Sequence, residues 1–396
     1  FWTWDPSNDR DFTGLQVLAK SQNPSRQTQF TQEVRYAGQL TSKISGVVGV
    51  FFIDQTSKTN GTEESGNAQW RFSQSTTNTA LWSTPGLFEG YGIKTNAKIH
   101  STSTAVFGQI DWAITERLHI LPGLRYNYDS KDADYYRVTY GGLQTTDPAL
   151  IAIKKSVYSD QAFVAGDDDT DFSGNLTVNF KASDKINAYA TYAKSYKPIG
   201  VNVAGLPTIA GLPALELAVI KPEDVNHYEV GIKTSPFKNA ILNLTLFNTD
   251  IKDFQTNVQA AELGVNRGYL ANADLVRVKG AELDASFIIN NHFSVTGAAA
   301  YTDGKYVEFT NAPLPLEETG APVAFKDVSG TDLPGASRWA GSLGAEYTKN
   351  AKFFGNLGKF FFALDGYARS EFSSSPSASK YLIVPGYAIF NTRLGF

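Results

Sequence analysis

The sequence has no cysteine and no methionine among its 396 residues. The absence of cysteine removes disulfides and cysteine-ligated zinc sites, and it is compatible with a cell-envelope protein that uses no disulfides. Because neither an initiator methionine nor a signal peptide precedes the first residues, we expect this sequence to be a piece of a longer protein.

Long apolar runs are missing as well. The most apolar stretch covers only residues 44–53, whereas a membrane helix needs roughly eighteen or more continuous apolar residues. Helical membrane proteins are therefore excluded. A transmembrane β-barrel stays allowed, because its signal is alternation rather than overall hydropathy, and the mean hydropathy here is −0.23.

Strong charge and catalytic motifs are also absent. The chain has 35 basic and 39 acidic residues, and the net charge of −4 gives no reason to expect nucleic acid as a partner. There is no HExxH, P-loop, dinucleotide or nucleophile-elbow motif, and the four histidines are scattered, so we expect no enzyme, cofactor or metal. The acidic run at 167–171 lacks the spaced ligands and glycine of a calcium loop, and we interpret it as a solvated strand start.

What the sequence does contain is alternation, most clearly in its last fourteen residues. Phe390, Leu394 and Phe396 share one parity there, while Asn391 and Arg393 share the other. A period of two with an apolar and a polar side describes a strand between two unlike environments. The terminal aromatic is typical of an outer-membrane barrel strand and unusual for a soluble sandwich.

Similar segments recur along the whole chain, most of them about ten residues or longer, which is the length that a tilted strand needs to cross a bilayer. The predicted strands cover residues 28–38, 44–54, 99–113, 119–129, 170–181, 186–196, 226–235, 241–251, 273–287, 293–306, 336–348, 359–370 and 383–396. Short connectors (39–43, 115–118, 182–185, 236–239, 289–292 and the somewhat longer 349–358) alternate with long ones (55–98, 130–169, 197–225, 252–272, 307–335 and 371–382). Short turns at one end and long loops at the other are typical of outer-membrane barrels.

The alternation also assigns the two faces. Pro122, Leu124 and Tyr126 share one parity, and Gly123 and Arg125 share the other. Lipid would take the apolar set and an aqueous lumen the polar set. Alternation alone leaves a soluble sheet with one dry face as the alternative, and the loop asymmetry favours the barrel.

Several blocks stand out along the chain: FTQEVRYAG (30–38), FGQIDWAITERLHILPGLRYNYD (107–129), AYATYAKSYKPIGVN (188–202), KPEDVNHYEVGIKT (221–234), VKGAELDA (278–285), VSGTDLPGASRW (328–339) and the terminal Phe396. These blocks resemble TonB-dependent outer-membrane receptors and follow the order of that family. The resemblance implies an all-β fold, a transmembrane antiparallel β-barrel of about 22 strands around an N-terminal plug, with a TonB box ahead of the plug. We expect residues 1–396 to form about the C-terminal fourteen strands, with residues 1–4 as the end of a first, incomplete strand and without the plug.

Within that resemblance, three sets of residues become candidates. Lumen-facing charges that either dock the plug or are simply solvated are predicted at Glu33, Arg35, Arg125, Glu229, Lys233 and Glu282, with Lys279 close to Glu282. Loop aromatics that either bind ligand or pack the loops together are predicted at Trp70, Phe72, Trp82, Tyr135, Tyr136 and Tyr140. The resemblance implies an assembly signal at Phe390, Leu394 and Phe396.

The resemblance implies a bacterial outer-membrane receptor for energy-coupled uptake of a scarce, bulky nutrient, with a ferric siderophore as the leading candidate. Its implied partners are the TonB complex through the missing N-terminal part, outer-membrane lipid and lipopolysaccharide, the barrel assembly machinery and a small ligand such as an iron chelate. The alternatives are a passive porin-like channel that is complete at about fourteen strands and a structural barrel in an envelope assembly.

Overall fold

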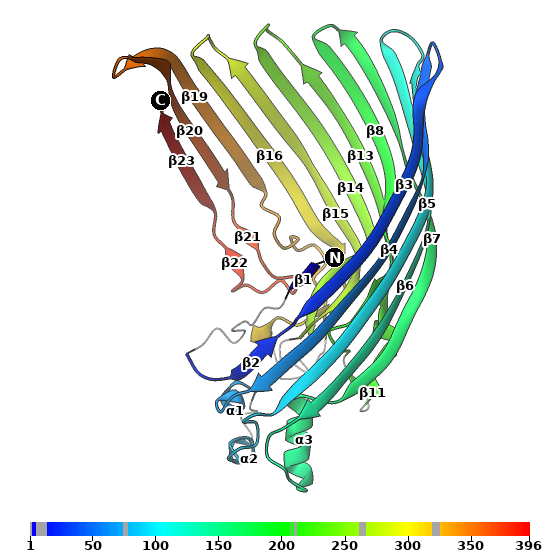
Figure 1. Ribbon diagram of the computed structural model, residues 1–396, viewed down its shortest axis with the longest axis vertical. Coiled ribbons are helices and arrows are strands. Elements are labelled where there is room, and N and C mark those ends of the chain that lie inside the picture. Colours follow the sequence, from blue (N-terminus) through cyan, green and yellow to red (C-terminus); the bar gives the residue numbers. More distant parts are fainter. Residues whose placement is uncertain are drawn as a thin grey trace.

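One large, strongly curved antiparallel sheet makes up most of the protein (Figure 1). The computed structural model describes residues 2–4, 14–73, 78–206, 208–209, 212–260, 267–318 and 325–396. The sheet has 15 strands, and all but β2 follow one another as hydrogen-bonded neighbours. Their order is β1 (Trp2–Trp4), β3 (Ser25–Thr41), β4 (Ile44–Ser65), β5 (Gly92–Ala113), β6 (Leu118–Tyr140), β7 (Gln161–Ser183), β8 (Ile186–Lys197), β13 (Glu223–Thr234), β14 (Ala240–Ala260), β15 (Arg267–Ile288), β16 (Phe293–Glu308), β19 (Trp339–Phe353), β20 (Asn356–Arg369) and β23 (Tyr387–Gly395).

The remaining elements lie at the end of the sheet that carries the long connectors (Figure 1). Strand β2 (Leu18–Gln22) pairs with the outer part of β4. Small two-stranded sheets are formed by β9 (Gly200–Val201) with β12 (Val219–Ile220), β10 (Thr208–Ile209) with β11 (Leu212–Pro213), β17 (Ala312–Pro313) with β18 (Phe325–Lys326), and β21 (Phe372–Ser373) with β22 (Ile383–Val384). The helices are α1 (Gln69–Ser73), α2 (Thr79–Trp82), α3 (Pro148–Val157), and the 3-10 turns η1 (Leu215–Leu217) and η3 (Leu316–Glu318).

The thirteen predicted segments all lie on strands of this sheet, and short turns join them at one end while long connectors join them at the other, as predicted. The predicted connector 349–358 is wrong in length. β19 continues to Phe353 and β20 begins at Asn356, so only Phe354 and Gly355 form the turn. Both have positive φ, 45° and 84°, which is the conformation of a tight two-residue hairpin turn.

Several of the predicted long loops are strand over part of their length instead. β4 continues to Ser65 and β5 starts at Gly92, which shortens the predicted loop 55–98; β6 continues to Tyr140 and β7 starts at Gln161, which shortens 130–169. In contrast, the predicted last strand 383–396 begins later. Pro385 and Gly386 separate β22 from β23, because proline cannot donate a ladder hydrogen bond.

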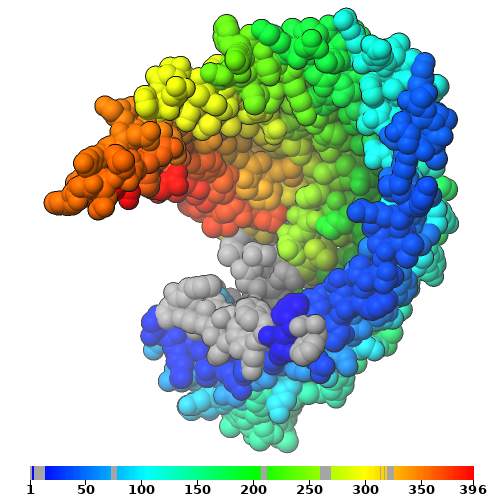
Figure 2. All heavy atoms as spheres, turned by 45° about the horizontal axis from the view of Figure 1, so that its top comes forward, coloured from blue at the N-terminus to red at the C-terminus, as the bar shows by residue number. Residues whose placement is uncertain are grey.

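The sheet is an open arc around a hollow (Figure 2). Among the described residues β1 pairs only with β3 and β23 only with β20, so these strands form no closed ring. The passive-channel alternative required such a ring of about fourteen strands. No helix in the described part of the chain is both long and apolar enough to cross a membrane.

Buried apolar side chains gather at the long-loop end rather than between layers of the sheet. Three clusters form there: one between the ends of β14–β16 and the following loops, one among α1–α3, and one between β5–β7 and the segment after β8. The middle of the sheet instead exposes large apolar residues on one side, including Leu124, Phe172 and Leu343 at 61, 57 and 62%. Such a face needs an apolar environment outside the protein.

Candidate functional site

The pairing register divides the large sheet into an apolar outer face and a polar inner face. Tyr126 of β6 and Phe172 of β7 are register partners on the outer face, with ring centroids 4.7 Å apart. Arg125 has the opposite parity, and its guanidinium carbon lies 5.0 Å from the Phe51 ring centroid and 5.6 Å from that of Phe107. This arrangement suits strands that separate lipid from an aqueous lumen.

The predicted lumen charges share the inner face with Arg125. Glu33 and Arg35 of β3 form an ion pair at 3.5 Å. On β13, Glu229 accepts a hydrogen bond of 2.7 Å from the Tyr189 hydroxyl. Lys233, on the same side of that strand, has its ammonium 5.4 Å from the Tyr189 ring centroid.

Glu282 of β15 also has inner parity, but Lys279 does not. Glu282 is the register partner of Thr245, which lies 3.2 Å from the Tyr189 hydroxyl on the inner wall. Lys279 is three residues earlier on the same strand and therefore points to the other side, where its ammonium lies 3.7 Å from Asp303. The prediction that Lys279 joins Glu282 on the lumen side is wrong.

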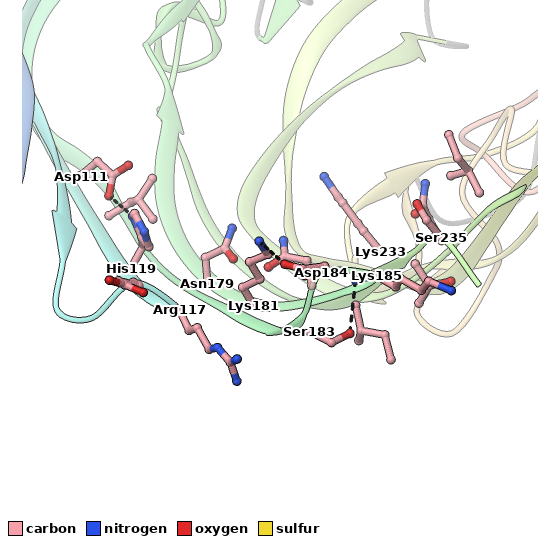
Figure 3. Close-up of a pocket in the computed structure, with 17 residues that line it drawn as sticks. Asp111, Arg117, His119, Asn179, Lys181, Ser183, Asp184, Lys185, Lys233 and Ser235 are labelled. Carbon is pink, nitrogen blue, oxygen red and sulfur yellow. Dashed lines mark hydrogen bonds and ion pairs between the residues drawn. The ribbon is translucent and has the colours of Figure 1, made fainter. Parts of the chain in front are cut away.

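A pocket of about 620 Å³ opens on the inner wall at the short-turn end (Figure 3). Two hydrogen-bonded pairs line it: His119 Nδ1 lies 2.7 Å from Asp111 Oδ1, and Lys181 Nζ lies 2.8 Å from Asp184 Oδ1. Lys233 reaches it from β13. The pocket therefore offers charges of both signs and suits a polar, charged segment rather than an apolar ligand.

Two of the predicted loop aromatics pack inside the loops. Trp70 and Trp82 lie against the cluster formed by α1–α3 and the start of β5, and the Trp82 ring centroid is 5.7 Å from that of Phe88. Phe72, on the same short helix as Trp70, keeps 56% of its surface exposed. Loop packing, one of the two predicted roles, is therefore what Trp70 and Trp82 do.

The three predicted loop tyrosines are on strand β6, so their assignment to a loop is wrong. Tyr135 is on the inner face and buried at 3% exposure, with its ring stacked on Phe163 at 4.9 Å. Tyr136 points outward and is 55% exposed. Tyr140 donates to Glu64 at 3.1 Å, and burial together with that carboxylate raises the pKa of Tyr140 to about 12.

The segment that follows β8 folds against the inner wall and is fixed by buried amides. Asn202 Nδ2 donates to the carbonyls of Leu217 at 2.6 Å and Leu270 at 3.0 Å, and Asn202 Oδ1 accepts from the Leu270 amide at 2.7 Å. Gln161 and the Leu206 backbone exchange two hydrogen bonds of 2.9 Å. Asn202 and Gln161 are only 3 and 5% exposed, so this inner loop is held in place.

The sequence alone does not predict this role. Asn202 ends the block IGVN, which carried the resemblance but received no function, and Gln161 carries no local signal at all. The Gln255 side-chain amide fixes the inner loop in the same way, since its Nε2 donates to the carbonyls of Pro198 and Lys221 at 2.9 and 3.0 Å. Only the folded sheet brings these amides to the inner loop.

A second inner pocket, of about 360 Å³, lies between this loop and the outer parts of β4–β6. Its lining residues are Asn23, Thr59, Gly61, Glu63, Ile93, Thr95, Ala97, Tyr135, Val203 and Ala204. Of the predicted ligand-binding aromatics, Tyr135 is the one that lines this pocket.

A family model described as TonB dependent receptor-like, beta-barrel, matches residues 2–396. The chain belongs to this family. The crystal structure of the ferric yersiniabactin uptake receptor FyuA from Yersinia pestis has a similar fold, with a TM-score of 0.69 at 18% identity over 96% of this chain. The pesticin receptor of Yersinia enterocolitica is 26% identical over 183 residues, 46% of this chain. The ferrichrome outer membrane transporter/phage receptor of Escherichia coli is 24% identical over 191 residues, 44% of this chain.

This TonB-dependent receptor barrel is a protein of the bacterial outer membrane, as its relatives are. The chain spans about half the length of the receptor whose fold it shares, 48%, and its match to each of the two curated relatives covers 23% of their length. The outer face of the sheet is accordingly the lipid side, and the inner wall is the lumen side. The family consists of receptors and transporters rather than enzymes.

The acidic run of the receptor lies in β7, where Asp167 and Asp168 are exposed and Asp169 and Asp171 are half-buried. In the described part of the chain, no group of three or more His, Asp or Glu residues could hold a metal ion.

The predicted assembly residues share the lipid side. Phe390, Leu394 and Phe396 are 73, 69 and 52% exposed, and Phe396 packs against Phe353 with centroids 5.4 Å apart. Phe396 also covers Gly358 of β20, where an added Cβ would meet its ring at 2.5 Å. Their geometry suits a lipid-side signal, and the role itself stays a prediction.

Proposed function

We propose that the receptor to which this chain belongs imports a scarce, bulky nutrient by TonB-dependent transport, with a ferric siderophore as its leading substrate. The observation that carries the proposal is the polar, charged inner wall of a sheet that matches the family model over residues 2–396. A wide lumen needs such a wall, because charged side chains there meet water or a polar plug instead of lipid.

We propose further that residues 1–396 form one portion of a longer receptor barrel of about 22 strands with an N-terminal plug. The match to about half the length of a related receptor supports this. In this arrangement Glu33, Arg35 and Arg125 line the wall that surrounds the plug. The charged pocket at the short-turn end receives a polar segment of it, near the region through which the TonB complex acts.

Three further partners belong to this proposal. The outer face is in contact with outer-membrane lipid and lipopolysaccharide, because its exposed apolar residues need a lipid environment. The barrel assembly machinery inserts the chain through its terminal strand, and an iron chelate enters from the long-loop end, where Phe72 and Tyr136 are exposed and Tyr135 lines a pocket.

The test uses the full-length gene in its host under iron limitation. Deletion should abolish growth on one or a few ferric chelates out of a panel that also contains cobalamin and free iron. The full-length gene should restore growth only when TonB is present. Growth that is unchanged by the deletion on every chelate, or restored without TonB, would contradict the proposal, and the second result would indicate a passive channel instead.

A further inference from the structure

A groove of about 330 Å³ lies on the lipid side of the sheet, where β3–β6 approach their short turns. All four strands line it, from Tyr36 and Leu40 on β3 to Leu124 on β6. The outward side chains of the lining are apolar or aromatic, so the groove has the chemistry of the lipid face around it. An apolar cavity of ~150 Å³ suffices for benzene, so this groove has room for a stretch of hydrocarbon chain.

The floor of this groove is made largely of glycine. Two neighbouring rows of outward residues cross the strands here: Tyr36, Val48, Gly108 and Leu124, then Gly38, Gly46 and Ile110. The next rows on either side carry large residues, the pair Val50 and Val106 on one side and the pair Ile44 and Trp112 on the other. Three glycines between two rows of large side chains therefore leave a hollow in the lipid face.

The glycines differ in what a side chain would meet. An added Cβ at Gly46 would lie 2.9 Å from the Gln109 carbonyl oxygen, so a side chain there would force the strands to shift. At Gly108 the nearest described atom beyond its chain neighbours is the Val47 carbonyl oxygen at 3.4 Å, which is an ordinary contact. The space above Gly108 is therefore open, and a larger side chain at this position would fill the groove without a clash.

Polar groups lie at the short-turn end of the groove. An added Cβ at Gly38 would lie 3.4 Å from the Tyr36 hydroxyl, so the Tyr36 ring runs along β3 toward the turn and carries its hydroxyl that way. Lys43 lies in the turn itself, three residues after Leu40, is exposed, and forms no ion pair within the described residues. Because outer-membrane barrels direct their short turns to the periplasm, these groups lie at the headgroup level of the inner leaflet.

We propose that this groove binds one acyl chain of a glycerophospholipid from the inner leaflet of the outer membrane, with the lipid phosphate at Lys43 and the Tyr36 hydroxyl. The groove is part of the lipid side of the sheet, so its occupant comes from the membrane rather than from the lumen. The apolar lining accepts hydrocarbon, and the cation at the short-turn end complements a phosphate. The inference rests on the fold and the outer-membrane location, and it does not depend on which nutrient the receptor imports.

The test titrates the purified full-length receptor in detergent with two probes and counts the bound lipid by native mass spectrometry. Phosphatidylglycerol has acyl chains and a phosphate, and diacylglycerol has the chains alone. Wild type should bind one phosphatidylglycerol about tenfold more tightly than diacylglycerol. Gly108→Leu fills the groove and should weaken the binding of both probes about tenfold. Gly297→Leu, which adds the same side chain opposite Leu343 on the lipid side of β16, is the matched control and should bind both probes like wild type.

Lys43→Glu covers the case in which Gly108→Leu does not fold. It should weaken the binding of phosphatidylglycerol about tenfold and leave that of diacylglycerol within about twofold. Lys238→Glu, in the short turn between β13 and β14, should change neither.

Equal phosphatidylglycerol binding by wild type, Gly108→Leu and Lys43→Glu would overturn the inference. A wild-type dimer that Gly108→Leu dissociates would also overturn it, because the occupant of the groove would then be a second copy of the receptor. Growth on ferric chelates tests the proposed function separately, so either proposal can fail without the other.

Discussion

Phe396 lies on the lipid side, where its ring covers Gly358 and packs against Phe353. We propose that the terminal aromatic is recognised during assembly, and we therefore expect full-length Phe396→Asp to reach the outer membrane at a severalfold lower level than wild type. A charge at the membrane edge costs only ~0–1 kcal/mol, so barrels that do form should be about as stable as wild type. Outer-membrane abundance measures this, with Tyr136→Ala as control. Equal abundance of the two variants would show that Phe396 has no such role.

Tyr91 provides a pH-dependent contact in the loop cluster. Its hydroxyl donates to the Tyr158 carbonyl at 2.6 Å, and burial raises the pKa of Tyr91 from 10.0 to about 12. The folded loops therefore favour the neutral phenol, so this contribution is fully present below pH 10 and is lost as the pH rises through about 12. We expect the phenolate absorbance that distinguishes wild type from Tyr91→Phe to appear near pH 12, and appearance near pH 10 would contradict the buried contact.

At the scale of single elements, the stability of helix α3 depends on its N-cap residue, Asp147. Asp147 accepts a hydrogen bond of 2.8 Å from the Ala149 amide, and Pro148 occupies the first turn. Asp147→Ala should destabilise the helix by about 1 kcal/mol. Faster protease cleavage after Lys154 in intact membranes would report it, whereas Thr146→Ala, on an exposed neighbouring side chain, should cleave at the wild-type rate. Equal rates for both variants would show that the cap is not needed.

Which elements could be predicted depends on where they lie relative to the lipid. Strand segments such as 119–129 alternate because one side meets lipid and the other the lumen. The outer parts of β4 and β7, up to Ser65 and from Gln161, lie beyond the lipid, so their outward side chains need not be apolar and the sequence there does not predict a strand. Helix α3 had a usable signal, because Asp147 and Pro148 start it.

The candidate site was predictable only in part, for a related reason. Parity alone placed Glu33, Arg35, Arg125 and Glu229 correctly on the polar side, since a side chain's face follows from its position in the strand. The inner pockets join residues that are far apart in sequence, such as Asn23 and Val203. No local sequence pattern carries that information. The side-chain amides that hold the inner loop in place are buried only in the folded sheet, and no short motif marks them.

At the scale of the whole molecule, the two faces of the sheet predict opposite responses to the same change. Leu343 is 62% exposed on the lipid side of β19, midway between Trp339 and Tyr347, and Ser342 points to the lumen. Leu343→Arg in the full-length receptor should lower the free energy of unfolding by ~2–4 kcal/mol, and Ser342→Arg should change it little. Denaturant titration in lipid vesicles measures both. A similar loss for both variants would contradict the assignment of the faces.

The wall of the receptor is much taller on one side than on the other (Figure 1). β6 has 23 residues and β23 has 9, so at roughly 3.3 Å per residue the first is roughly 75 Å long, against an apolar band roughly 25 Å tall. The region of β4–β7, with α1–α3 at its tip, therefore projects well beyond the apolar band at the long-loop end. A macromolecule too large for the lumen that approached from the long-loop end would meet this region first, so variation there would change the outer contacts of the protein without altering the lumen wall.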